Sequence, residues 1–123
     1  MREIKFRAWY KKKNWMYENN SLFTRIREIN SDEGLIYMQY TGIKDKNGVE
    51  IYEGDILEWR FKNMLTGVDT VVRYTVHYSE SSACFKTKEH GSVNDTLLML
   101  TLSKDVYVAG NIYENPELVS EVN

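Results

Sequence analysis

The sequence predicts a mainly β protein, built as a small antiparallel barrel or barrels with a short helix near the carboxyl end. Three observations predict this fold class. The chain contains 3 Trp, 9 Tyr and 4 Phe, an excess of side chains that favour strands over helices. Several segments alternate apolar and polar residues with the period of two that is typical of strands. Glycine-containing turns separate them, as in small barrels, whose sharp corners need residues without a Cβ.

The first predicted strand covers residues 4–10. Its apolar side chains alternate with Lys5 and Arg7, which is the pattern of a half-buried strand. A polar turn follows at residues 11–14, and a return strand begins at Trp15. The first thirteen residues contain six basic side chains and one acidic side chain. The amino end is therefore a basic region in a chain whose formal net charge is −2.

The next segments lead to the centre of the chain. Residues 22–29 fit both strand and helical spacing, and their threonine and isoleucine content favours a strand. Residues 30–34 form a polar turn, and residues 35–40 are predicted to be a strand that enters the central turn region.

The stretch 40–59 is the densest run of turn residues in the chain. Asn47 and Gly48 predict a tight hairpin turn, because both central residues of that turn need a positive φ. A short strand follows, and the chain then turns again at Gly54 and Asp55. We predict that the Asp55 carboxylate accepts backbone N–H groups in this second turn and has no catalytic role.

Two longer strands are predicted at residues 55–61 and 70–78. Both alternate, and their separation favours antiparallel pairing through the loop at 62–69. That loop contains Met64 and Leu65, two apolar residues that predict a contact either within the fold or across an interface.

The carboxyl-terminal part contains two further strands and one ambiguous segment. Residues 83–87 and 106–113 are predicted strands, and Gly110 in the second marks a bulge or a close approach of the backbone. The segment 94–102 fits both one or two helical turns and a buried strand. A short helix is predicted to start at Pro116, which suits the first helical position.

Four segments of the chain resemble the YopX family, a group of phage and prophage proteins of unknown function. They are the opening residues 2–9, the central motifs 40–48 and 51–56, and the motif 110–118. The resemblance implies a phage or prophage origin and an all-β fold with an SH3-like barrel portion, at about residues 40–113. It implies no activity, because the family has none to carry over.

The predicted domain organisation follows from this resemblance. Residues 1–39 form an amino-terminal β subdomain packed on the rest, and residues 40–123 form an SH3-like barrel subdomain with a carboxyl-terminal lid. The alternative is one continuous domain, which 123 residues also allow.

No pattern in the sequence indicates catalysis or a cofactor, and we expect the protein not to be an enzyme. Cys84 is the only cysteine, so it forms no intrachain disulfide, and we expect it to be a half-buried strand residue. His77 and His90 lack metal-ligand spacing, so no metal site is expected. With no signal-peptide pattern and no long apolar run, we expect a protein of the bacterial host cytoplasm that has no membrane partner.

Two functions remain as hypotheses. The first is a non-enzymatic protein-interaction module that self-associates and binds host or phage proteins, because aromatic side chains dominate interface energetics. The second is a nucleic-acid-binding accessory protein that combines stacking with phosphate contacts at the basic amino-terminal hairpin. The candidate nucleic-acid contacts are Arg7, Trp9, Lys11, Lys12, Lys13 and Trp15.

Overall fold

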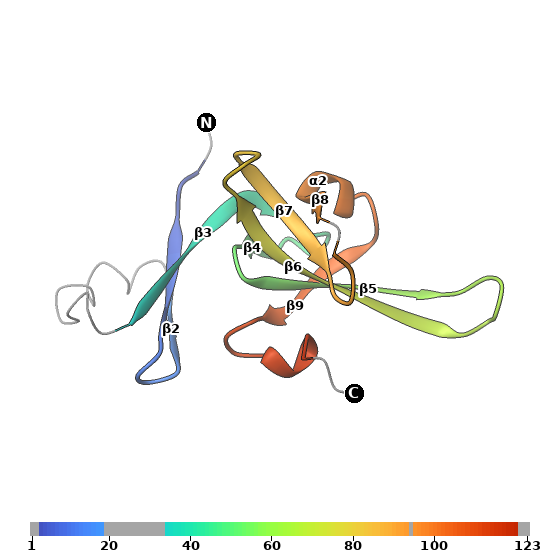
Figure 1. The fold of residues 1–123 in the computed structure, drawn as a ribbon, viewed down its shortest axis with the longest axis horizontal. Coiled ribbons are helices and arrows are strands. Elements are labelled where there is room, and N and C mark those ends of the chain that lie inside the picture. Colours follow the sequence, from blue (N-terminus) through green and yellow to red (C-terminus); the bar gives the residue numbers. More distant parts are fainter. Residues whose placement is uncertain (1–2, 19–33, 94, 121–123) are drawn as a thin grey trace.

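The computed structural model describes residues 3–18, 34–93 and 95–120. The segment 22–29, predicted as strand or helix, lies outside the described residues. The prediction of a mainly β fold is confirmed: the strands form two antiparallel sheets that curl into a half-barrel (Figure 1).

The first sheet is amino-terminal, with the strand order β2-β1-β3-β4. Its members are β1 (Phe6–Tyr10), β2 (Trp15–Tyr17), β3 (Leu35–Lys44) and β4 (Glu50–Tyr52). The first half of β3 pairs with β1, and its second half pairs with β4. The division predicted between residues 39 and 40 therefore falls inside a continuous strand that belongs to both halves of the sheet.

The second sheet has the strand order β8-β7-β6-β5-β9. Its members are β5 (Asp55–Lys62), β6 (Asp69–Ser79), β7 (Cys84–Glu89), β8 (Asp95–Leu97) and β9 (Val106–Asn111). The predicted pairing of segments 55–61 and 70–78 is confirmed, with Ile56 opposite Thr75 at one end and Lys62 opposite Asp69 at the other.

The ambiguous segment 94–102 contains both structures that the sequence allowed. The short strand β8 leads into one helical turn, α2 (Leu98–Thr101), whose Leu98 is buried. The hydroxyl groups of Thr101 and Thr87 lie 2.6 Å apart, which ties the helical turn to β7. The helix predicted at Pro116 is the 3₁₀ helix η2 (Pro116–Leu118).

The main core lies beneath the second sheet. Its fully enclosed side chains come from both sheets and from α2, and they are Ile51, Leu57, Tyr74, Val76, Leu98 and Val106. Each large apolar side chain of this kind stabilises the fold by about 1.5–3 kcal/mol. A smaller cluster of Ala8, Tyr10 and Tyr17 lies within the first sheet.

The strand β1 is more buried than a half-buried strand would be. Residues Arg7 to Tyr10 are all buried, so both faces of β1 are covered. On one face Trp9 stacks against Tyr113, with ring centroids 5.9 Å apart. Tyr113 belongs to the carboxyl-terminal part of the chain. The alternation of apolar and polar residues within 4–10 therefore does not reveal this contact.

Candidate functional site

A buried ion pair joins the two sheets. The Arg7 guanidinium on β1 lies 2.5 Å from Oδ1 of Asp55, the first residue of β5. Asp55 is 1% exposed and Arg7 is 8% exposed. The guanidinium also lies over the Tyr52 ring, 4.7 Å from its centroid. Both charges are thus removed from water and paired, as buried ionised groups require.

Asp55 also shapes the turn between β4 and β5. Its Oδ2 accepts a hydrogen bond from the Tyr52 N–H at 2.7 Å, as the sequence led us to expect of a turn carboxylate. Gly54 has φ +82°, and a Cβ there would lie 3.3 Å from both the Met38 sulfur and the Tyr113 ring. The turn therefore needs glycine for its conformation and for the space around it.

The Asp55 carboxyl group has a perturbed pKa. Burial raises its pKa above the ordinary value, and the charge of Arg7 and the hydrogen bond from the Tyr52 N–H oppose that rise. Of the two groups that favour the ionised form, the Tyr52 N–H belongs to the same turn as Asp55, whereas Arg7 belongs to β1 of the other sheet. The pair is therefore sensitive to any change that loosens the contact between the sheets.

The Asn-Gly turn differs from the predicted geometry. Gly48 has φ +82°, but Asn47 does not have the positive φ that the predicted turn requires. Asp45 organises the turn instead, because its Oδ1 accepts hydrogen bonds at 2.8 Å from the N–H groups of both Asn47 and Val49. Its Oδ2 accepts a third, at 2.8 Å, from the Val108 N–H of β9.

Asp45→Ala is expected to lower the free energy of unfolding by about 1–2 kcal/mol, because three backbone N–H groups lose their acceptor. Asp45→Asn, which keeps one side-chain oxygen, should lose less. Urea denaturation measures both variants. An unchanged midpoint for Asp45→Ala would show that the carboxylate does not hold the turn against β9.

Gly110 lies at an irregularity of the sheet. Ile56 is opposite Gly110 and Leu57 is opposite Val108, so the register of β5 and β9 shifts by one residue there. A Cβ on Gly110 would lie 2.4 Å from Oδ1 of Asn115. That oxygen accepts the Asn111 N–H at 3.2 Å, and the Asn115 side chain makes no capping hydrogen bond to η2.

A second charged cluster surrounds Glu58, which the sequence places on the polar side of its strand. Glu58 is nevertheless only 4% exposed. Its carboxylate accepts hydrogen bonds from the Tyr107 hydroxyl, from Arg60 Nε at 3.1 Å and from Arg73 Nε at 3.0 Å. Burial alone would raise the pKa of Glu58, but these hydrogen bonds outweigh it and lower the pKa below its ordinary value.

The structure separates the six candidate nucleic-acid contacts into two groups. Arg7 and Trp9 are buried, Arg7 against Asp55 and Trp9 against Tyr113. The remaining four residues lie at the exposed end of the β1–β2 hairpin, where Trp15 is 60% exposed. They are Lys11, Lys12, Lys13 and Trp15. Arg7 and Trp9 thus serve the fold, and the surface that remains is smaller than the sequence predicted.

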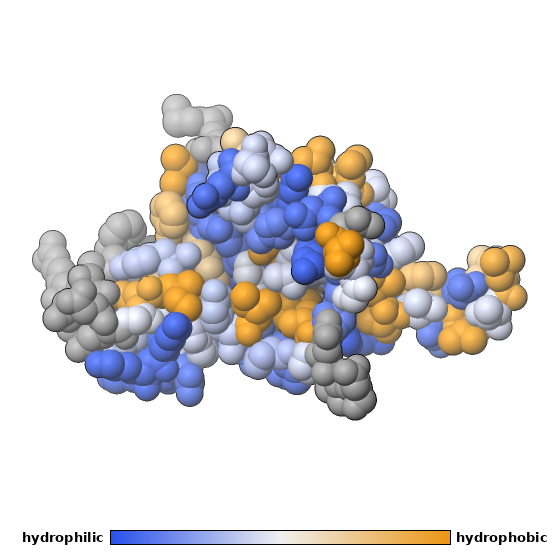
Figure 2. Space-filling view, viewed as in Figure 1, coloured by the Kyte–Doolittle hydropathy of each residue, from blue (hydrophilic) through white to orange (hydrophobic). Residues whose placement is uncertain are grey.

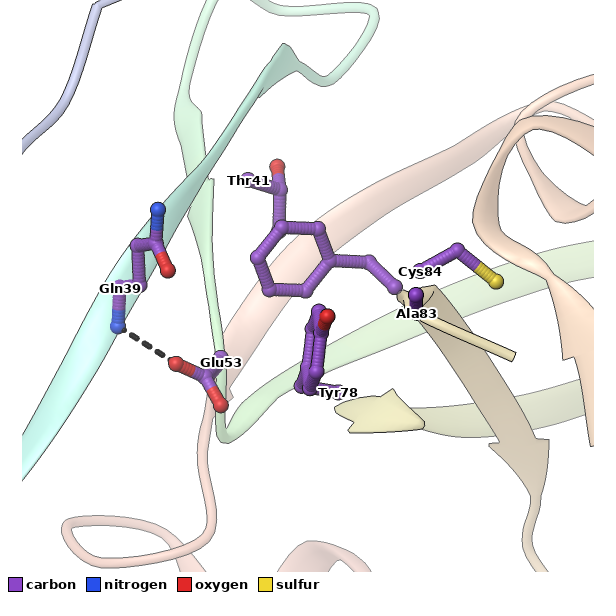
Figure 3. Close-up of a pocket in the computed structure, with 7 residues that line it drawn as sticks. Gln39, Thr41, Glu53, Tyr78, Ala83 and Cys84 are labelled. Atoms are coloured by element: carbon purple, nitrogen blue, oxygen red, sulfur yellow. Dashed lines mark hydrogen bonds between the residues drawn. The ribbon is translucent and has the colours of Figure 1, made fainter. Parts of the chain in front are cut away.

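A recess of about 450 Å³ lies between β3 and the turn that joins β6 to β7 (Figure 3). Glu53 lines it and accepts the Gln39 N–H at 2.8 Å. Tyr78 and Phe85 contribute aromatic edges, and Cys84, half-buried at the start of β7, lies at the same end. The recess combines polar and apolar surface from both sheets.

The hairpin of β5 and β6 extends beyond the rest of the sheet as an arm, which we define as residues 60–71. The pairing of β9 with β5 ends at Trp59, and β7 pairs with β6 only from Tyr74 onward. Figure 1 shows the arm projecting from the body, and Figure 2 shows hydrophobic side chains at its tip. Met64 and Leu65 there are 91% and 97% exposed.

The described residues contain no group of three or more His, Cys, Asp or Glu side chains that could hold a metal ion. Across the same ranges, no helix has the length and apolar character needed to cross a membrane.

Comparisons with known proteins agree with the fold. A family model described as YopX protein matches residues 19–120. The chain is similar to the crystal structure of protein EF1440 from Enterococcus faecalis, with 26% sequence identity and a TM-score of 0.66, over 98% of this chain and 100% of that one. No curated protein matches the chain. Because the family model spans most of the sequence, the chain belongs to the YopX family.

Proposed function

We propose that this protein is a non-enzymatic protein-interaction module that self-associates and binds host or phage proteins. The observation that supports this function best is the arm, which holds Met64 and Leu65 almost fully in water. Burying a side chain of this size in an interface contributes about 1.5–3 kcal/mol. Two adjacent apolar side chains at the end of a projecting hairpin therefore form a compact anchor.

The tip of the arm is ordered by its own hydrogen bonds. Asn63 Oδ1 accepts the N–H groups of Leu65 and Thr66 at 2.9 Å and 3.3 Å. The Asn63 N–H donates to the Val68 carbonyl at 2.8 Å, and the Gly67 N–H donates to the Asn63 carbonyl at 2.7 Å. The exposed side chains are thus presented on a preformed turn, which reduces the entropy lost on binding.

A pull-down from host lysate tests this function. The bait is compared with the arm variant Met64→Ser/Leu65→Ser and with Val49→Ser, which changes an exposed apolar residue at the tip of a different turn. Capture of a protein that survives nuclease and is lost only in the arm variant is the expected result. Equal capture by all three baits, or none by the unmodified protein, would contradict the proposal.

The second candidate function is nucleic-acid binding at the β1–β2 hairpin. It is supported by the exposed Trp15 next to Lys11, Lys12 and Lys13, since an aromatic ring beside cations suits single-stranded bases and phosphates. The binding of a fluorescent oligonucleotide should weaken steeply with salt and with Trp15→Ala. No binding at low salt would exclude this function.

A further inference from the structure

The recess between the two sheets lies at the open end of the main core. Tyr74, Val76 and Tyr78 share one face of β6, because side chains alternate along a strand. Tyr74 and Val76 are buried in the core, whereas Tyr78 is 43% exposed. Phe85, opposite Tyr78 in β7, packs against the same core and also lines the recess. The apolar interior of the protein therefore continues to the surface at this point.

Two aromatic rings form one wall of the recess. The ring centroids of Tyr78 and Phe85 lie 5.4 Å apart with the ring planes at 74°, which makes them an edge-to-face pair. Such rings attract cations through their π-faces. Within residues 3–18, 34–93 and 95–120, no basic side chain lies over either ring. The aromatic surface that lines the recess is therefore not used by a cation from these parts of the chain.

Glu53 supplies a negative charge on the other side of the recess (Figure 3). Its Oε1 accepts the Gln39 N–H at 2.8 Å, a bond that orients the carboxylate but does not neutralise it. Across the described part of the chain, no basic side chain forms an ion pair with this carboxylate. The Arg7 guanidinium lies 3.5 Å from the Glu53 carbonyl oxygen and is paired with Asp55 instead. The recess thus combines an aromatic wall with a half-buried carboxylate that lacks a counter-ion.

We propose that the recess binds an arginine side chain of a partner protein. This inference rests on the proposed function and adds a second contact to that of the arm. A guanidinium group pairs with carboxylates and stacks on aromatic rings, so it suits both Glu53 and Tyr78. Its apolar stem lies along Phe85 and Ala83, as the stems of basic side chains do on apolar surfaces. The volume of about 450 Å³ is that of a small-ligand site.

Titration of the full chain with the peptide acetyl-Gly-Gly-Arg-Gly-Gly-amide, followed by NMR of the isotope-labelled protein, tests this site. A matched peptide contains citrulline, which keeps the shape of the arginine side chain and removes its charge. Glu53→Gln removes the carboxylate charge but keeps an oxygen for the Gln39 N–H, and Tyr78→Leu removes the ring but keeps an apolar side chain. Glu80→Gln and Tyr37→Leu are the matched controls, because both residues are exposed and neither lines the recess. Circular dichroism verifies that each variant is folded.

The arginine peptide is expected to shift the amide signals of residues 78–85 and to bind about tenfold more tightly than the citrulline peptide. Glu53→Gln should weaken its binding about tenfold and Tyr78→Leu about threefold, while the two control variants bind as the unmodified protein does. No binding of the arginine peptide, equal binding of the citrulline peptide, or unchanged affinity in Glu53→Gln and Tyr78→Leu would overturn the inference. The pull-down with the arm variant is independent of this titration. If arm-dependent capture persists when the titration fails, the proposed function still stands.

Discussion

Asp55→Ala is expected to lower the free energy of unfolding by about 3–5 kcal/mol, the usual cost of removing one partner from a buried ion pair. The variant leaves the Arg7 guanidinium buried without its counter-ion and the Tyr52 N–H without its acceptor. Because Arg7 belongs to the first sheet and Asp55 to the second, the loss falls on the contact between them. Urea denaturation at neutral pH measures the effect.

Two further variants separate the charge from the turn. Asp55→Asn keeps an oxygen that can accept the Tyr52 N–H, so it should lose less stability than Asp55→Ala. The double variant Arg7→Met/Asp55→Asn removes both charges, and its loss should be smaller than the sum of the two single losses. A melting temperature of Asp55→Ala equal to that of the unmodified protein would contradict both roles.

Glu58→Ala is expected to cost about 3 kcal/mol at neutral pH, because it leaves Arg73 partly buried without its acceptor. The effect should depend on pH. The folded-state pKa of Glu58 lies below the ordinary value of 4.5, so its ionised form stabilises the fold. That contribution is complete above the unfolded-state pKa and is lost as the pH falls through the folded-state pKa.

Glu58→Gln provides the comparison for this pH dependence. The difference in unfolding free energy between it and the unmodified protein should be largest near neutral pH and should shrink below about pH 4.5. Arg60→Gln is a useful control, since Arg60 is exposed and an exposed partner contributes about 0–1 kcal/mol. A difference that is constant from neutral to acidic pH would contradict the lowered pKa.

The parts of the fold that depend on local pattern could be predicted from the sequence. The hairpin of β5 and β6 follows from period-two alternation. Met64 and Leu65 in its loop, for which the sequence predicts a contact within the fold or across an interface, are almost fully exposed. The sequence of segment 94–102 fits both a strand and a helix, and the segment contains one of each, β8 and α2. A run of leucines satisfies either periodicity over so few residues.

The buried ion pair could not be predicted in the same way. Arg7 and Asp55 are 48 positions apart, and alternation within residues 4–10 assigns Arg7 to a polar face without showing what covers it. Trp9 was a candidate for stacking on nucleic-acid bases, but it is buried, because Tyr113 from a distant part of the sequence packs against it. Glu58 is hidden by two arginines and Tyr107, which come from three different positions in the second sheet.

Asp45 was not identified from the sequence as a turn residue, because the turn was attributed to Asn47 and Gly48. The Asn-Gly dipeptide suggested a turn held by two positive φ angles, whereas a carboxylate two residues earlier holds the turn through side-chain hydrogen bonds. An aspartate two residues before an Asn-Gly pair is the sequence feature that points to this arrangement.

The most direct measurement of the central claim is hydrogen–deuterium exchange along the arm at low and high protein concentration. The account predicts that the amides at the tip of the arm, residues 63–68, exchange more slowly as concentration rises. The amides of residues 47–49, in a turn outside the arm, should exchange at the same rate throughout. Exchange at the tip of the arm that is independent of concentration would contradict the claim that the arm is the surface of self-association.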